Sequence, residues 1–103
     1  MSFDKFKISD EIKKALELLE YNKATPIQEK IIPLILGGNN LMVKSKPGSG
    51  KTAAFSIPLI DMVKWDNKNA QALILSPTRE LAMQIREEMF NIGRFKRIKV
   101  ACI

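Results

Sequence analysis

Residues 45–52 read Ser45-Lys46-Pro47-Gly48-Ser49-Gly50-Lys51-Thr52 and stand between an apolar run, 41–43, and a segment with helical spacing, 53–65. Strand, glycine-rich loop, Lys-Thr and helix is the order of a phosphate-binding loop. Gly48 and Gly50 let the backbone fold around an anion, with its amide N–H groups and the positive end of the helix dipole directed inward. We predict that Lys51 reaches the terminal phosphates and that the Thr52 hydroxyl ligates the accompanying Mg²⁺.

Two residues of this stretch depart from the strict pattern. Ser45 stands where the pattern has Gly, and Pro47 removes one N–H that a phosphate-binding loop can use. The alternative is a Gly/Ser/Pro turn that leads into a helix, with Lys51 and Thr52 in its first turn by chance. Because the G-x-G-K-T core lies in the expected context, the sequence favours a nucleoside triphosphate site.

Length and composition indicate one globular domain. The chain has 103 residues, of which 46% are hydrophobic, enough for a single core. Its longest uncharged run, 31–43, is interrupted by Pro33 and Gly37-Gly38, and the first residues lack an apolar signal core, so no membrane span is expected. The single cysteine, Cys102, and the absence of His exclude an internal disulfide and a Cys-based zinc site, which favours a cytoplasmic location.

The net charge of +6 is distributed unevenly along the chain. Residues 1–30 carry six Lys and six Asp or Glu, so the excess begins at Lys44. The run 94–99 contains Arg94, Lys96, Arg97 and Lys99 without an acid. This asymmetry fits a polyanionic partner, and equally fits a solvated basic surface.

Apolar spacing and capping residues predict four helices and three strands. The helices are expected from Asp10 to about Glu20, from Pro26 to Gly37-Gly38, from Lys51 to about Lys64 and from Arg79 to Ile92, with bends at Pro33 and Pro58. The strands are expected at 41–45, 72–76 and 98–103. Strands that alternate with helices predict an α/β fold with a parallel sheet.

Three stretches together make the chain resemble the N-terminal part of a DEAD-box RNA helicase. Phe3 with Tyr21-Asn22-Lys23-Ala24-Thr25-Pro26-Ile27-Gln28 resembles the Q motif, residues 45–52 resemble motif I, and Pro77-Thr78-Arg79-Glu80-Leu81-Ala82 matches motif Ia letter for letter. The departures are Glu20 for a usual Gly, Ala24 for a usual Pro, and Ser45, Lys46 and Pro47 for the usual Ala, Gln and Thr. The resemblance implies a P-loop NTPase fold of the RecA-like type, a three-layer αβα arrangement truncated to about three strands. Residues 1–40 are then the Q-motif helical region and residues 41–103 the P-loop α/β core of a partial helicase ATP-binding domain.

The resemblance also implies how ATP is bound. Gln28 is expected to read adenine with its amide, whereas a capping box with Thr25 is the structural alternative. Tyr21, or Phe3 behind it, is expected to cover the purine by stacking, with core packing as the alternative. The phosphates are expected to be held by Ser45, Lys46, Pro47, Gly48, Ser49, Gly50, Lys51 and Thr52, the last two also being the catalytic residues and Thr52 the Mg²⁺ ligand.

RNA is the partner that motif Ia implies. Pro77, Thr78 and Arg79 open a helix whose N–H groups, hydroxyl and guanidinium are expected to hold the sugar-phosphate backbone without reading its sequence. The alternative is that Thr78 only caps the helix and that Arg79 is a solvated charge.

The expected function is that of the ATP- and RNA-binding front half of a helicase motor domain. These 103 residues contain neither the Asp-Glu-Ala-Asp motif nor the Ser-Ala-Thr motif, so we expect this chain alone to be inactive as an ATPase. Three strands leave open sheet edges, which predicts completion by a second copy, a partner segment or the remainder of the domain. The alternatives are another P-loop nucleotide-binding protein, such as a nucleotide kinase, and a non-enzymatic RNA-binding or assembly module.

Overall fold

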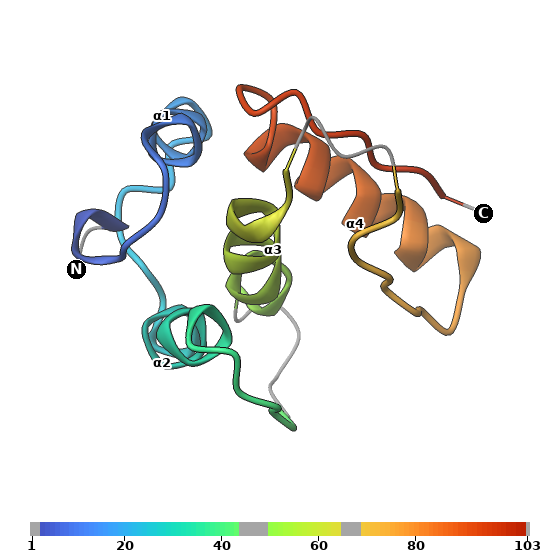
Figure 1. The fold of residues 1–103 in the computed structure, drawn as a ribbon, viewed down its shortest axis with the longest axis horizontal. Coiled ribbons are helices and arrows are strands. Elements are labelled where there is room, and N and C mark those ends of the chain that lie inside the picture. The colour runs from blue at the N-terminus through green and yellow to red at the C-terminus, as the bar shows by residue number, and fades with distance from the viewer. Residues whose placement is uncertain (1–2, 44–49, 65–68, 103) are drawn as a thin grey trace.

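Four α-helices build the part of the chain that the computed structural model describes, which is residues 3–43, 50–64 and 69–102 (Figure 1). A short 3-10 helix, η1 (Phe3–Lys5), precedes α1 (Asp10–Leu18), α2 (Pro26–Leu36), α3 (Lys51–Met62) and α4 (Arg79–Ile92). All four α-helices begin at the predicted residues, although Ser9, the expected cap of α1, makes no side-chain cap bond. No helix in this described part combines the length and the apolar character needed to cross a bilayer.

Two of the helix N-termini are capped by threonine. The Oγ1 of Thr25 accepts a bond from the N–H of Gln28 at 3.3 Å, and the Gln28 side chain accepts one from the N–H of Thr25 at 2.9 Å, which forms a capping box on α2. Thr78 caps α4 by accepting from the N–H of Leu81 at 3.1 Å. These bonds satisfy N–H groups that have no partner inside a helix, and they explain why the helices begin where they do.

The helix α3 lies between α2 and α4, and α1 packs against α4 (Figure 1). Both α2 and α3 continue through an internal proline, Pro33 and Pro58. The core fills the space among the helices and includes residues from η1 and from the connection before α1. Its buried members are Phe3, Phe6, Ile8, Ile12, Leu16, Ala24, Ile32, Ala53, Ile57, Ile60, Met89 and Ile92.

The expected sheet is where the structure departs from the sequence prediction. The described residues of the three predicted strands, 41–43, 72–76 and 98–102, form no strand ladder. Ile74 still packs against the core, whereas its neighbours Leu73 and Leu75 are 84% and 85% exposed. The strands of a parallel sheet pair with neighbouring strands and are buried on both faces, whereas here one face is left in solvent.

Helices α1 and α2 end with the same backbone pattern but with different residues. In α2 the N–H of Asn39 bonds to the carbonyl of Leu34 at 3.1 Å, and Gly38 takes the left-handed conformation at φ 81°. In α1 the N–H of Tyr21 bonds to the carbonyl of Leu16 at 2.9 Å, but the left-handed residue is Glu20, at φ 62°. Because a side chain disfavours this conformation, α1 ends with backbone strain that α2 avoids.

Candidate functional site

Gly50 is the last residue before α3, and its place requires glycine. Its φ of 86° lies in the left-handed region, and a Cβ built on it would stand 2.6 Å from the Nε2 of Gln28 and 3.0 Å from the Oγ1 of Thr25. The end of the glycine-rich stretch therefore packs directly on the start of α2. Residues 45–49 of that stretch lie outside the described residues, so the phosphate contacts of Ser45, Lys46, Pro47, Gly48 and Ser49 remain predictions.

Lys51 and Thr52 form the first turn of α3. The Lys51 side chain is exposed, and none of the described carboxylates lies within ion-pair distance of it. Thr52 is half-buried. Among the described residues, no three His, Cys, Asp or Glu side chains gather to hold a metal ion. A single hydroxyl at Thr52 suits Mg²⁺, which keeps its waters and is bound through substrate phosphates and few protein ligands.

Gln28 connects the start of α2 to the start of α3. Its side chain is only 4% exposed, its Oε1 accepts from the N–H of Thr25, and its Nε2 donates to the carbonyl of Gly50 at 3.2 Å. The capping box is therefore confirmed, and both ends of the amide are engaged within the protein. Adenine reading by Gln28 stays a prediction, and it would use the second N–H of the amide and the second lone pair of its Oε1.

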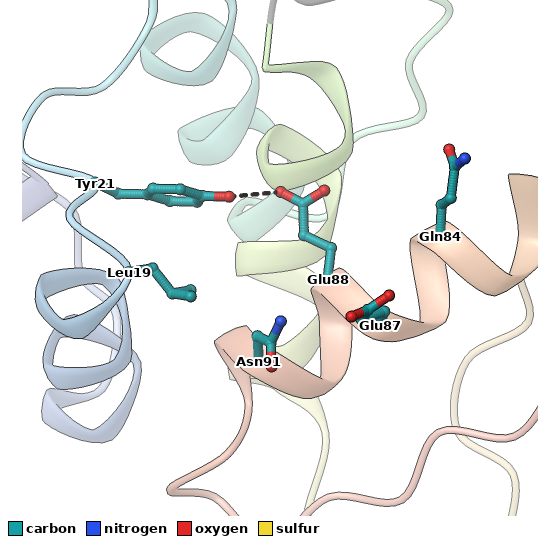
Figure 2. Close-up of a pocket in the computed structure, with 6 residues that line it drawn as sticks. All are labelled: Leu19, Tyr21, Gln84, Glu87, Glu88 and Asn91. Carbon is teal, nitrogen blue, oxygen red and sulfur yellow. Dashed lines mark hydrogen bonds between the residues drawn. The ribbon is translucent and has the colours of Figure 1, made fainter.

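Tyr21 faces α4, where its hydroxyl donates to the Oε1 of Glu88 at 3.0 Å (Figure 2). The two side chains line a cleft of about 260 Å³ together with Leu19, Gln84, Glu87 and Asn91. Burial raises the pKa of the Tyr21 hydroxyl above its ordinary 10.0, and the nearby Glu88 carboxylate raises it further. Stacking of Tyr21 on adenine stays a prediction; what the structure adds is a hydroxyl anchored to α4.

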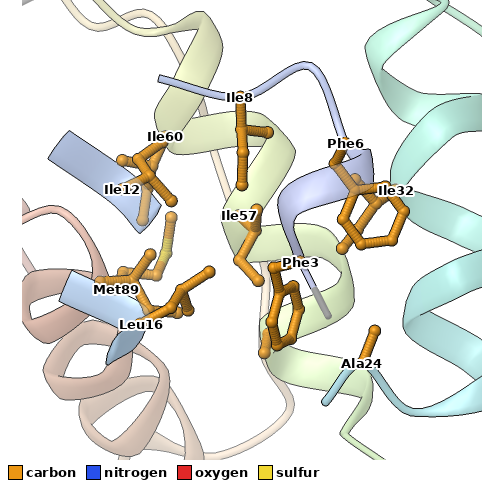
Figure 3. Packing of buried hydrophobic residues seen from close by; sticks show 12 residues of the cluster. Phe3, Phe6, Ile8, Ile12, Leu16, Ala24, Ile32, Ile57, Ile60 and Met89 are labelled. Carbon is orange, nitrogen blue, oxygen red and sulfur yellow. The ribbon is translucent and has the colours of Figure 1, made fainter. Parts of the chain in front are cut away.

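Phe3 belongs to the core. Its side chain is 5% exposed, and its ring centre lies 6.0 Å from that of Phe6 at an interplanar angle of 54° (Figure 3). Ile57 of α3 and Ala24, just before α2, belong to the same cluster. In this structure Phe3 holds η1 against these helices, the packing role that the sequence offered as the alternative, while its stacking on adenine stays a prediction.

Pro77, Thr78 and Arg79 are all exposed at the start of α4. Apart from its cap bond, Thr78 accepts a bond at its carbonyl from the Oγ of Ser76 at 3.1 Å. Arg79 forms no ion pair with a described carboxylate. The helix end that is predicted to hold a phosphate is therefore open to solvent, with its cap formed and its arginine available.

Lys96 has a role that the sequence did not predict. Its Nζ donates to the carbonyls of Ile60, Asp61 and Val63 at 3.0, 2.9 and 3.1 Å, and so caps the C-terminus of α3. The Asp61 carboxylate in turn accepts from the N–H of Ser9 at 2.8 Å, just before α1. The only signal in the sequence was a lysine after α4, and nothing indicated that it contacts a helix more than 30 residues away.

The matching family model identifies the class of protein. Residues 25–103 match the DEAD/DEAH box helicase model, which covers most of the chain. The chain therefore belongs to the DEAD/DEAH box helicase family.

Individual relatives agree with this assignment. The ATP-dependent RNA helicase DbpA of Bacillus subtilis is 52% identical over 101 residues, which are 98% of this chain and 21% of DbpA. The helicase CshA of Limosilactobacillus reuteri is 44% identical over 103 residues, 100% of this chain and 21% of CshA. The chain thus spans about a fifth of the length of these relatives.

Solved structures show the same fold. A DEAD box protein from the hyperthermophile Methanococcus jannaschii superposes with a TM-score of 0.88 at 40% identity, over 97% of this chain and 27% of that one. Dbp5 of S. cerevisiae bound to RNA and ADP BeF3 gives 0.89 at 36% identity, over 93% of this chain and 25% of Dbp5. Both likenesses are consistent with the predicted P-loop NTPase fold.

Proposed function

We propose that this chain is the front part of an ATP-dependent RNA helicase motor domain. It binds ATP at the start of α3 and the sugar-phosphate backbone of RNA at the start of α4. The observation that carries the proposal is the bond from the Gln28 amide to the Gly50 carbonyl, next to Lys51. It joins the residue expected to read adenine to the end of the loop expected to hold the phosphates, so one nucleotide can contact both.

The ATP site divides its work between two helices. From α2, the Gln28 amide offers one donor and one acceptor, the pattern that matches the edge of adenine. From α3, Lys51 and the N–H groups of the first turn supply positive charge for the phosphates. The Thr52 hydroxyl would hold Mg²⁺, which would supply positive charge to neutralise the phosphates.

The sheet belongs to this proposal as well. We place parallel strands at 41–45, 72–76 and 98–103, within a three-layer αβα domain. One support is that Ile74, Ile98 and Val100 pack against the helical core. The other is that Leu73 and Leu75 are exposed, as expected for strand residues whose second covering layer is absent. A second chain or the remainder of a helicase-length protein supplies that layer.

RNA remodelling and ATP hydrolysis belong to the longer protein of the relatives' length. DbpA and CshA are named ATP-dependent RNA helicases, and Dbp5 has been solved with RNA. For this chain alone we propose binding without useful hydrolysis, because none of its motifs places a carboxylate to orient the attacking water. A cytoplasmic location is proposed from the single cysteine, Cys102.

Nucleotide titrations test the proposal. We expect fluorescently labelled ATP with Mg²⁺ to bind more tightly than labelled GTP, and Gln28→Ala to remove that preference. Lys51→Ala is expected to weaken both nucleotides by roughly 10- to 100-fold, the loss of about 1.5–3 kcal/mol for a hydrogen bond to a charged group. Equal binding of ATP and GTP would instead favour a different kind of P-loop protein.

RNA binding needs a separate measurement. We expect Arg79→Gln to lower the affinity for single-stranded RNA and to reduce the slope of log K against log salt by roughly 0.7, the value of one phosphate contact. If ATP with Mg²⁺ leaves RNA affinity unchanged, and Lys51→Ala has no effect, the chain is a non-enzymatic RNA-binding module.

A further inference from the structure

We propose that the chain carries a second binding site for the RNA phosphodiester backbone, at the C-terminal end of α3. The site consists of Lys14 on α1 and of Arg94, Phe95 and Arg97 in the turn after α4, and we call it the basic corner. The proposal rests on the proposed function in one respect only, that RNA is the polyanion.

The basic corner is separate from both sites described above. Lys96, inside the same turn, bonds to the carbonyls of Ile60, Asp61 and Val63, which places the turn at the opposite end of α3 from Lys51. The 14 residues of α4 separate it from Thr78 by roughly 20 Å at about 1.5 Å per residue. An RNA strand bound at Thr78 therefore reaches the basic corner only through another of its nucleotides.

Two cations share one aromatic ring in the basic corner. The Nζ of Lys14 lies 4.9 Å from the ring centre of Phe95, and the Cζ of Arg94 lies 5.5 Å from it. Neither cation pairs with a carboxylate of the described residues. The ring attracts each of them, so two cations without a carboxylate partner are held at one place, where an anion can approach them.

A cleft beside the ring gives the anion a place. It measures about 290 Å³ and is lined by Glu11, Phe95, Lys96 and Arg97. Arg97 stands at φ 58°, a left-handed conformation that a long side chain disfavours and that persists only where the surroundings impose it. The three bonds of Lys96 fix the turn on α3, so the cleft is formed before any ligand arrives.

The charges around the cleft favour a polyanion. Among the described residues Glu11 is the one acid that lines it, and the nearby Asp61 carboxylate, which accepts from the N–H of Ser9, adds a second negative charge. The positive charges around the cleft are those of Lys14, Arg94, Arg97 and Lys96, and they outnumber the negative charges. Arginine forks match phosphate oxygens, and flat guanidinium and phenyl groups can stack with bases, which favours RNA over an acidic peptide.

The salt dependence of RNA binding tests the proposal. A labelled, unstructured single-stranded RNA is titrated with the chain at several KCl concentrations, and binding is followed by fluorescence anisotropy. We expect the double variant R94Q/R97Q to reduce the slope of log K against log salt by about 1.4, twice the single-strand value of about 0.7 per contact. At 0.1 M salt this corresponds to a loss of roughly 25-fold in affinity.

A matched control separates this site from net charge. The double variant K23Q/K30Q removes two exposed lysines elsewhere on the chain, and its slope should change much less. Both arginines of the test variant are exposed, so its circular dichroism and thermal midpoint should match the parent chain. Poly-L-glutamate, used as a second labelled probe, represents an acidic protein partner.

The outcomes separate this proposal from the proposed function. If Arg79→Gln weakens RNA binding while R94Q/R97Q does not, the basic corner is overturned and the motif Ia contact stands. If R94Q/R97Q weakens binding while Arg79→Gln does not, the basic corner stands and the motif Ia contact falls. A loss of poly-L-glutamate binding with RNA binding intact overturns RNA as the ligand, and a parent chain that binds no RNA overturns both.

Discussion

The N-terminal end of α3 follows Gly50, which packs on Gln28, and it carries the exposed Lys51. At the C-terminal end of α3, the charge that compensates the helix dipole comes from the chain itself. Lys96 neutralises the negative end of the helix dipole with three bonds to carbonyls. Lys51, by contrast, stands at the positive end, where a cation is unfavourable unless an anion is bound. The comparison shows that one end of α3 is completed by the fold, whereas the other carries an exposed cation, which fits the phosphate site proposed there.

The largest effect is expected from Gly50→Ala at the ligand end. The new Cβ would collide with the buried Gln28 amide and force a left-handed alanine, at a cost of about 2–4 kcal/mol in unfolding free energy and with lower nucleotide affinity. Urea unfolding measures the first effect and nucleotide titration the second.

Gly38→Ala is the control for Gly50→Ala. Gly38 is also left-handed, but nothing lies within 4 Å of a Cβ placed there, so only backbone strain of about 1 kcal/mol is expected. Equal losses for the two alanine variants would show that contact with Gln28 does not matter at Gly50.

Lys96→Met is expected to cost about 2–3 kcal/mol at the other end of α3. Three helix carbonyls lose a charged donor, and the methionine preserves most of the aliphatic stem. The thermal midpoint should fall by about 4–8 °C for each kcal/mol in a domain of this size. Lys99→Met, an exposed lysine on the same stretch, should change it by less than about 0.5 kcal/mol.

The variant Glu20→Gly tests how much stability a helix C-terminus gains when glycine occupies the left-handed position. No capping side chain comparable to Lys96 is involved in this change. We expect a gain of about 0.5–1 kcal/mol, because relief of the left-handed strain exceeds the added entropy of the unfolded chain. Glu17→Gly, inside α1, should instead lose about 1 kcal/mol. A loss at both positions would contradict the strain assigned to Glu20.

The smallest effect concerns Tyr21, whose hydroxyl bonds to Glu88 on α4. Its folded-state pKa lies above the ordinary 10.0, so above about pH 10 the folded protein keeps a proton that the unfolded chain releases. Stability is therefore full below pH 10 and falls as the pH rises. Unfolding free energies measured between pH 9 and 11 should fall more for the parent chain than for Tyr21→Phe.

The helices could be predicted from the sequence because their signals are local. The Thr25 and Thr78 caps lie within three residues of the N–H groups they satisfy, so each helix start can be read from its own segment. The link from Gln28 to Gly50 was not predicted, since it spans 22 residues and depends on how α2 meets α3. The family resemblance named the residues of the site but not this bond.

The strands and the role of Lys96 could not be predicted for related reasons. The apolar run of Leu73, Ile74 and Leu75 predicted a buried strand, but of these only Ile74 packs against the core. A ladder also requires neighbouring strands, and these do not form in the described residues. For Lys96, composition suggested a solvated or RNA-binding charge, while its position after α4 brought it to the carbonyls of α3. Such a contact depends on the tertiary fold.

The exposed leucines at positions 73 and 75 have a practical consequence for work with this chain in solution. Exposed apolar side chains outside any helix promote self-association, and the tendency grows with protein concentration and with salt, which screens the repulsion between positively charged copies. Titrations at high salt are thus the ones in which clustering of the protein can imitate a change in ligand affinity. Light scattering recorded alongside each salt series distinguishes the two.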